Sequence, residues 1–244
     1  DSDAQVLSCC ALSRAMTLGM RERRGLGCGS DPMMGRQCAE AQAEDLAELT
    51  EGADLVLVLA GMGGGLGTGA APVMARQART AGALVIGLVT MPFDFQGKRC
   101  SEQARAGLDA MRAAADAVLV LPNQGVSSLC SEEASAMETF ESANRMILEC
   151  LAGLGRMLRG GGLLPSGVAE LDHAMRGGHA AWALVEESTE GRGRAGRLAK
   201  ALLEHPFLKD GFDLRDAPAM VAMLLGGPEL KISEVDRVMK DLYQ

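Results

Sequence analysis

Three short apolar runs in the first half of the chain predict the strands of a sheet. Their residues do not alternate with polar ones, which is typical of strands buried on both faces in parallel sheets. The runs are 54–60, 83–89 and 117–121. Helical patterns precede or separate them, at 31–50, 70–80 and 101–115, and Asp31 with Pro32 forms a helix start. This order predicts an α/β fold with a doubly wound, mostly parallel sheet.

The pattern changes after Asn123. One long helix is predicted over 132–158, and Arg159-Gly-Gly-Gly162 ends it. The remaining predicted elements are helices at 169–176, at 194–203 and from Ser233, with strands at 180–185 and 219–225. We therefore expect an α/β domain over 1–131, a central helix over 132–158 and a second, smaller α/β domain over 159–244.

The densest group of glycines follows the first predicted strand directly. Six of the nine residues from Gly61 to Gly69 are glycine, and the next helix is expected to begin at Ala70. A helix N-terminus has unpaired N–H groups and a partial positive charge, and glycines let an anion reach them. Thr68 adds a hydroxyl donor. The pattern favours a phosphate-binding loop at the carboxyl end of a strand over a tight turn without a ligand.

Two common nucleotide signatures fit this loop poorly. A Walker loop requires Gly-Lys-Ser/Thr, and the glycine run contains no lysine. Residues 65–70 satisfy the loose G-x-G-x-x-A dinucleotide fingerprint, but Val89-Thr90-Met91 offers no acidic residue at the end of the next strand. A dinucleotide-dependent oxidoreductase is thus an alternative that the sequence disfavours.

Composition narrows the function classes. A net charge of −8, a pI near 5 and 3% aromatic residues argue against a nucleic-acid binder. No apolar run reaches the ~18 residues of a membrane span, so no direct membrane insertion is expected. The seven cysteines include no C-x-x-C pair, which favours reduced core thiols over a metal site or a disulfide framework.

Several segments together resemble one family. Residues 63–69, Gly-Gly-Gly-Leu-Gly-Thr-Gly, are similar to the GGGTGTG signature of the tubulin/FtsZ family, with Leu66 in place of the first Thr. The similarity to bacterial FtsZ continues in the family's order along the chain. Residues 1–5 resemble NTDAQ, 24–32 resemble RGLGAGANP, 90–99 resemble TxPFxFEGxxR, and 122–123 match the end of IPN.

This resemblance implies a GTP/GDP site, with Mg²⁺ as an ion that can accompany the nucleotide. The implied phosphate-binding residues are Gly27, Gly29, Gly63, Gly64, Gly65, Leu66, Gly67, Thr68 and Gly69. Asn123 and Gln96 would lie near the sugar, and Arg99 would compensate for Cys100, which stands where an Arg is usual. Phe140 and Asn144, four apart on one helix face, would contact the guanine. Without the resemblance, a core Phe140 and an exposed Asn144 are the simpler interpretation.

The family hydrolyses GTP where two subunits meet, with two carboxylates inserted by the next subunit. Here Pro165, Gly167 and Glu170 replace the family's Asn, Asp and Asp, so Glu170 is the remaining catalytic candidate. Loss of a positioned acid or base typically lowers a rate by ~10² to 10⁴. We therefore expect weak or absent GTP hydrolysis in filaments of this chain alone.

The resemblance also implies an assembly and a place in the cell. We expect head-to-tail filaments of this chain, or of this chain with a conventional FtsZ, at a cytoplasmic division ring in bacteria. Membrane-adaptor division proteins would bind a tail that is not present in this sequence. The alternative is a non-hydrolysing paralogue that modulates or caps filaments. The family's first strand and first glycine loop are missing before Asp1 and its last strands after Gln244, so we expect a truncated sequence rather than a genuine short paralogue.

Overall fold

The computed structural model describes residues 1–8, 15–19, 24, 26–131, 133–159, 167–176, 178–180, 193–205 and 221–242. The chain divides into two compact units. The first unit comprises Asp1–Ala134 and Met175–Ala180, and the second comprises Ser135–Ala174 and Ala181–Gln244. The three parts expected from the sequence, with boundaries at 131 and 158, stay a prediction.

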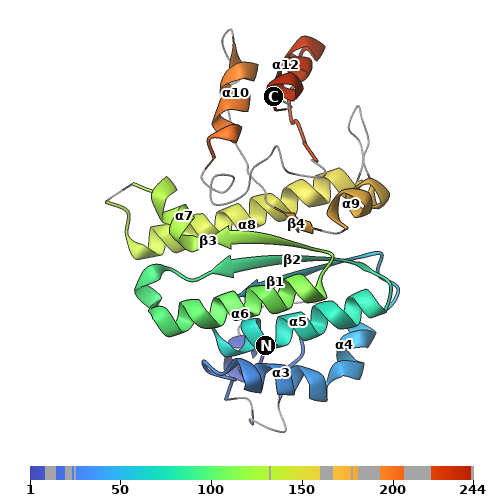
Figure 1. The fold of residues 1–244 in the computed structure, drawn as a ribbon, viewed down its shortest axis with the longest axis vertical. Helices are drawn as coiled ribbons and strands as arrows, with labels where there is room; N and C mark the ends of the chain where they lie inside the picture. Colours follow the sequence, from blue (N-terminus) through green and yellow to red (C-terminus); the bar gives the residue numbers. More distant parts are fainter. Residues whose placement is uncertain are drawn as a thin grey trace. The chain divides into compact units, whose positions relative to one another are not determined.

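The first unit is built on one parallel sheet with the strand order β1-β2-β3-β4 (Figure 1). The strands are β1 (Leu55–Gly61), β2 (Leu84–Met91), β3 (Ala117–Pro122) and the short β4 (Gly178–Ala180). Gly61 pairs with Thr90 and Met91 with Pro122, so the first three strands end at the same edge. These strands occupy the three apolar runs, which confirms the predicted parallel α/β fold. Residues 181–185 of the predicted fourth strand lie outside the described residues.

The missing polar alternation in β2 has a simple physical cause. Val85 and Val89 belong to a core cluster with side chains of the flanking helices, and both are fully buried. Ile86 and Leu88, which point to the other face of the strand, are 0% and 3% exposed. Since both faces are buried, every position of the strand favours an apolar residue.

Two crossover helices cover one face of this sheet. Helix α5 (Gly65–Thr80) connects β1 to β2, and α6 (Lys98–Ala114) connects β2 to β3. Helices α3 (Pro32–Ala41) and α4 (Ala43–Thr50) pack against α5 on its outer side (Figure 1). Shorter helical segments complete the unit: α1 (Ala4–Ser8), η1 (Asp94–Gln96) and α7 (Asn123–Leu129).

The structure corrects two helix boundaries in this unit. The single helix predicted over 31–50 is two helices, because Gln42 leaves the helical conformation with φ −119° and ψ 29°. Its predicted start is confirmed, since the Asp31 carboxylate accepts hydrogen bonds from the N–H groups of Met33 and Met34. Helix α5 begins at Gly65 rather than at Ala70, so Gly65, Gly67 and Gly69 of the glycine run lie within the helix.

A buried carboxylate, that of Asp116, lies at the amino-terminal ends of β2 and β3. The side chain of Asp116 is 2% exposed, and its Oδ2 accepts a hydrogen bond from the Val85 N–H at 2.9 Å. Its Oδ1 lies 3.2 Å from Arg79 Nε and 3.7 Å from an Arg176 nitrogen. Because Arg79 lies in the last turn of α5, this cluster ties the end of that helix to the starts of β2 and β3.

All secondary-structure elements described in the second unit are helices. Its helices are α8 (Ala136–Arg159), α9 (Val168–Met175, whose last residue belongs to the first unit), α10 (Arg194–Leu203) and α12 (Ile232–Leu242). Ala199 and Val238 lie in a shared core cluster of α10 and α12. The two helices are also joined by Arg194, which donates to both Glu234 carboxylate oxygens at 2.6 and 2.7 Å.

Two predictions for this unit need correction. The helix expected from Glu132 begins at Ala136, because Ser135 and Glu138 form a capping box. The Ser135 N–H donates to Glu138 Oε2 at 2.7 Å, and the Glu138 N–H donates to Ser135 Oγ at 3.2 Å. Residues 221–225 of the strand predicted over 219–225 are not in a strand, and 219–220 lie outside the described residues. In the described ranges, every helix is too short or too polar to cross a membrane.

Candidate functional site

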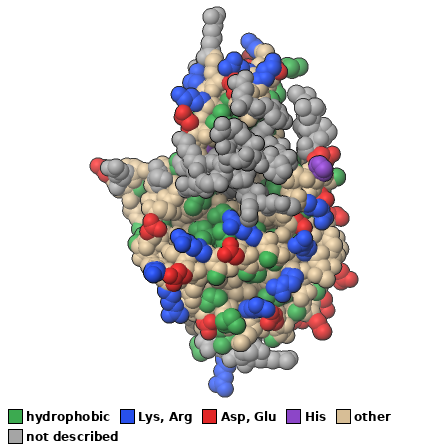
Figure 2. Space-filling model, viewed as in Figure 1, with side chains coloured by type: hydrophobic (Ala, Val, Ile, Leu, Met, Phe, Trp, Pro, Cys, Tyr) green, Lys and Arg blue, Asp and Glu red, His purple; other side chains and the backbone are tan. Residues whose placement is uncertain are grey.

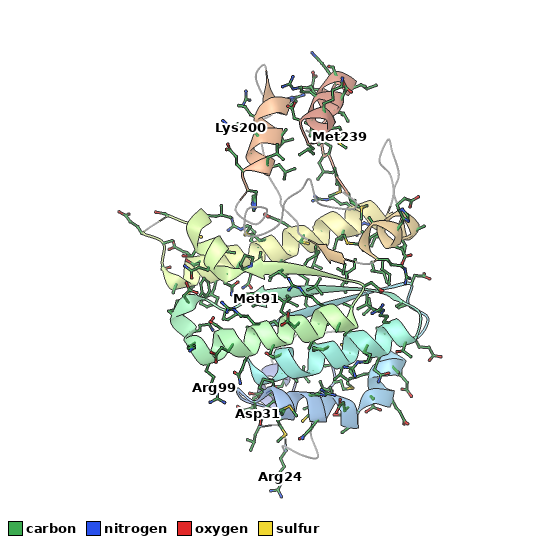
Figure 3. The ribbon with its side chains drawn as sticks, viewed as in Figure 1. Arg24, Asp31, Met91, Arg99, Lys200 and Met239 are labelled. Carbon is green, nitrogen blue, oxygen red and sulfur yellow. The ribbon has the colours of Figure 1, made fainter. Side chains whose placement is uncertain are left out.

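The candidate site lies where β1, β2 and β3 end together. Met91, labelled in Figure 3, is the last residue of β2, and the glycine run follows β1 at the same edge. The Met62 N–H donates to Thr90 O at 2.9 Å, which fixes the first residue after β1 against the neighbouring strand. Ligands of open α/β sheets bind at such carboxyl edges.

The turn between β1 and α5 is held by a buried hydroxyl. Thr68 Oγ1 accepts a hydrogen bond from the Gly63 N–H at 2.8 Å. Gly63 has φ +104°, a conformation that favours glycine, and a Cβ there would lie 2.5 Å from Cys100 Sγ. The Thr68 oxygen therefore shapes the loop, a task that the sequence did not reveal. Its predicted contact with a phosphate stays a prediction.

Packing inside the protein accounts for most of the glycines. A Cβ at Gly67 would collide with the carbonyl oxygen of Gly61, and one at Gly69 with that of Pro32. A Cβ at Gly65 would lie 2.6 Å from Gly29 O. Gly64 differs, because beyond its chain neighbours no atom of the described residues lies within 4 Å of the position its Cβ would take. The number of glycines is thus weaker evidence for a ligand than the sequence suggested, and the open side at Gly64 is stronger.

The first turn of α5 has the properties of an anion site. Gly64 is the N-cap residue and, having no side chain, cannot cap the helix. The Gly65 N–H donates to Gly29 O at 2.8 Å, while the N–H groups of Leu66 and Gly67 at the next two positions have no side-chain cap. Uncapped amides and the helix dipole together attract a negatively charged group.

The second predicted phosphate loop lies directly against this helix start. Gly27 and Gly29 have φ values of +74° and +55°, and Gly29 O accepts the hydrogen bond from Gly65. Ser2 anchors this loop, because its carbonyl oxygen accepts a hydrogen bond from the Gly27 N–H at 3.0 Å. The structure therefore brings both glycine-containing loops together, although Gly29 and Gly63 are 34 positions apart in the sequence.

Of the residues expected near the sugar, Gln96 forms a hydrogen bond within its own turn and Arg99 is exposed to solvent. Gln96 is exposed, and its Oε1 accepts from the Phe93 N–H at 2.8 Å, which closes the turn of η1. Arg99 is exposed and extends outward from the start of α6 (Figure 3). Cys100 packs against Gly63, as described above. The roles of Gln96 and Arg99 toward a sugar stay predictions.

Asn123 offers an unpartnered acceptor at this edge of the sheet. It begins α7 directly after β3, and the residue is 9% exposed. Its Oδ1 is buried and has no hydrogen-bond partner among the described atoms. A buried acceptor left unsatisfied costs about 1–3 kcal/mol. A ligand hydroxyl or N–H group at this point would remove that cost.

Three further predicted residues lie outside the first unit. Phe140 and Asn144 are both exposed and one turn apart on α8 in the second unit, so their contact with guanine stays a prediction. Glu170 lies in the first turn of α9, and its Oε2 accepts from the Gly167 N–H at 2.8 Å. This hydrogen bond lowers the pKa of the Glu170 carboxyl from its ordinary value. Pro165 lies outside the described residues.

Parallel strands, a glycine turn and an uncapped helix start are typical of phosphate-binding α/β domains. The family model for the GTPase domain of the Tubulin/FtsZ family matches residues 1–131, which is more than half of the chain. The chain therefore belongs to the tubulin/FtsZ family. GTP and GDP are the nucleotides expected of such a domain.

Solved structures agree with this assignment. An FtsZ mutant from M. jannaschii is 30% identical, with a TM-score of 0.79 and coverage of 85% of this chain and 62% of that chain. An empty FtsZ dimer from M. jannaschii is 29% identical, with a TM-score of 0.77 and coverage of 85% and 60%. CetZ2 from Haloferax volcanii, in a GTPγS-bound protofilament, is 21% identical with a TM-score of 0.71 and coverage of 84% and 63%, which shows the fold alone.

The family model confirms the predicted family. The solved structures are longer than this chain and do not test the bacterial assignment. The chain spans about three fifths of the length of the three structures. The assignment to the bacterial branch of FtsZ stays a prediction, because M. jannaschii and Haloferax volcanii are archaea.

Proposed function

We propose that this chain is an FtsZ-like guanine-nucleotide-binding protein of bacterial cell division. The observation that carries the proposal is the start of α5, where the Leu66 and Gly67 amides have no side-chain cap and Gly64 faces open space. Membership of a GTPase-domain family makes GTP and GDP the ligands that fit this site.

In this proposal, different residues bind the phosphates, the sugar and the guanine base of the nucleotide. The Leu66 and Gly67 amides donate hydrogen bonds to phosphate oxygens. Asn123 Oδ1 accepts from a sugar hydroxyl, with Gln96 and Arg99 nearby. Phe140 and Asn144 recognise the guanine, and Mg²⁺ accompanies the phosphates.

The proposed assembly is a head-to-tail filament. A nucleotide face on one subunit and the Glu170 region on the next form a heterologous contact, which repeats indefinitely unless it closes into a ring. A dimer and a protofilament among the similar structures support this view. The filament would contain this chain alone or with a conventional FtsZ, and adaptor proteins would link it to the membrane at the cytoplasmic division ring.

GTP hydrolysis is proposed to be weak, and one observation favours the non-hydrolysing alternative. Glu170 uses its carboxylate to cap its own helix, and its pKa is lowered. A carboxylate with a lowered pKa is a poorer general base than one tuned toward neutral pH. A filament modulator that binds GTP without hydrolysing it is therefore the second candidate function.

Titration calorimetry of the chain with GTP, GDP and ATP tests the binding proposal. We expect heat with both guanine nucleotides and much less with ATP. Sedimentation with GTP, alone and mixed with a conventional FtsZ, then separates the two candidates: a filament former pellets alone, whereas a modulator changes only the pellet of its partner. Absence of heat with GTP and GDP from folded protein would overturn the proposal.

A further inference from the structure

Two thiols lie next to each other where the loop that contains Cys28 packs against α3. Cys28 Sγ and Cys38 Sγ are 3.9 Å apart, and the residues are 5% and 0% exposed. A disulfide has an S–S length of about 2.05 Å, so the two sulfurs need to approach by roughly 1.9 Å. We propose that Cys28 and Cys38 form a reversible disulfide when the protein is exposed to a peroxide.

The local structure indicates which sulfur moves. Cys38 belongs to α3, whose backbone touches that of α5 so closely that a Cβ on Gly35 would collide with Gly65 O. Cys28 lies in a loop between Gly27 and Gly29, two residues with positive φ. A loop with glycine on both sides adjusts its backbone more easily than a packed helix. Cys28 therefore approaches Cys38.

The chemistry balances with hydrogen peroxide as the two-electron oxidant. The Cys28 thiolate attacks one peroxide oxygen, the O–O bond breaks, and a sulfenic acid forms with release of one water after protonation. Cys38 sulfur then attacks the Cys28 sulfur, the S–S bond forms, and the sulfenic hydroxyl leaves as a second water. Together the two thiols lose two electrons and two protons, and the peroxide is reduced to two waters.

The disulfide would act on the candidate site through one hydrogen bond. Gly29 follows Cys28, and its carbonyl oxygen accepts from the Gly65 N–H at the start of α5. Movement of Cys28 toward α3 pulls on this contact. This part rests on the proposed function: loss of the hydrogen bond is expected to weaken guanine-nucleotide binding about threefold to tenfold.

Peptide mapping tests the disulfide without any nucleotide. Trypsin cuts after Arg24, Arg36 and Arg76, so Cys28 and Cys38 lie alone in peptides 25–36 and 37–76. The reduced chain is treated with hydrogen peroxide, alkylated with iodoacetamide and digested without reductant. We expect one species with the summed mass of the two peptides less two hydrogens, which a thiol reductant splits. Cys28 oxidised to sulfinic acid, or Cys38 joined to peptide 1–14, would overturn the proposal.

Cys28→Ala is the matched control for the nucleotide part. Peroxide also oxidises methionines, and this variant keeps all 15 of them. We expect peroxide to weaken GTP binding by the unsubstituted chain, a thiol reductant to restore it, and the variant to be unaffected. If the variant does not fold, Cys38→Ala takes its place, because it removes the other thiol of the same pair. A disulfide without any change in GTP affinity would overturn the coupling and leave the disulfide itself supported.

Discussion

The helix starts of α5 and α9 differ in a way that decides what each can do. At α5 the N-cap residue Gly64 has no side chain, and the amides that follow have no side-chain cap. At α9 the Glu170 carboxylate turns back and accepts from the Gly167 N–H. Both ends carry the same dipole, but α9 has a carboxylate of its own in the first turn, whereas α5 has no acidic residue there and leaves its dipole to an external anion.

Helix starts with a glutamate cap, like that of α9, also occur elsewhere in the second unit. Glu138 accepts from the Ser135 N–H at the start of α8, and Glu234 accepts from the Lys231 N–H at the start of α12. Three helices of the second unit thus use a glutamate of their own first turn as a cap. A glycine N-cap without a side-chain cap also starts α6 and α10, so an uncapped start does not identify a site by itself. At α5 it coincides with the glycine turn that follows β1 at the carboxyl ends of the strands.

The largest effect is expected where packing forbids a side chain at the open helix start. Gly67→Ala places a methyl group against the Gly61 carbonyl oxygen, so β1 and α5 must separate. Overpacking of this kind costs about 1–3 kcal/mol and occasionally more. We expect thermal unfolding, followed by circular dichroism, to show a clearly lower midpoint for this variant.

Gly64→Ala is the matched control, because its methyl group enters open space. Its unfolding midpoint should stay close to that of the unsubstituted chain. An equal loss of stability in both variants would show that the contrast between Gly64 and Gly67 is wrong.

The next effect is on binding. Gly64→Asp introduces a carboxylate at an N-cap residue with φ −88° and ψ 174°, the extended conformation that capping aspartates adopt. The new side chain would cap the Leu66 or Gly67 amide and repel a phosphate. We expect GTP binding to weaken by about a hundredfold, which is ~2.7 kcal/mol, while the unfolding midpoint stays equal or rises. Unchanged affinity in calorimetry would remove the start of α5 from the binding site.

The first three strands and the start of α3 at Asp31 were predictable, whereas the start of α5 and the break at Gln42 were not. The first six residues of β2 are all buried and none of them has a polar side chain, so the sequence pattern alone located the strand. Helix α5 begins at Gly65 although glycine has a low helix propensity, because Gly65, Gly67 and Gly69 allow backbones to touch. The break at Gln42 has no glycine or proline to mark it. Packing between backbones decided the start of α5, and a local sequence pattern does not contain that information.

The candidate site was predictable as a set of residues but not in its hydrogen bonds. Sequence reasoning placed Thr68 and Gln96 toward a ligand, whereas both accept hydrogen bonds from the backbone of their own loops. It gave no signal for the Cys28–Cys38 pair, which is ten positions apart and meets only because the loop folds over α3. On the face shown in Figure 2, acidic and basic side chains are interspersed, as the mixed charge of the sequence suggests.

A smaller effect, on the pH dependence of stability, is expected at the start of α12, which Glu234 caps. The hydrogen bonds from the Arg194 side chain, and then from the Lys231 N–H, lower the pKa of Glu234 to about 2. A lowered carboxyl pKa adds stability above the unfolded value, near 4.5, and that stability is lost as the pH falls through about 2. We expect Glu234→Gln to unfold at a lower temperature than the unsubstituted chain at pH 7. The difference should shrink between pH 4.5 and 2, and a difference that does not change with pH would contradict the ion pair.

The smallest effect is expected at Glu170, the other side of the comparison. If Glu170 serves only as a cap, Glu170→Gln keeps an oxygen that accepts from the Gly167 N–H, and GTP turnover should change less than about twofold. Glu170→Ala removes the cap, so it should lower the helix content of α9, measured by hydrogen exchange of that segment, and affect turnover only as far as the helix is disturbed. A general base would behave differently: both variants would lose activity alike, by about 10² or more, because neither side chain can take up a proton. Phosphate release from saturating GTP, measured over hours for the three proteins, therefore separates a cap from a catalytic carboxylate.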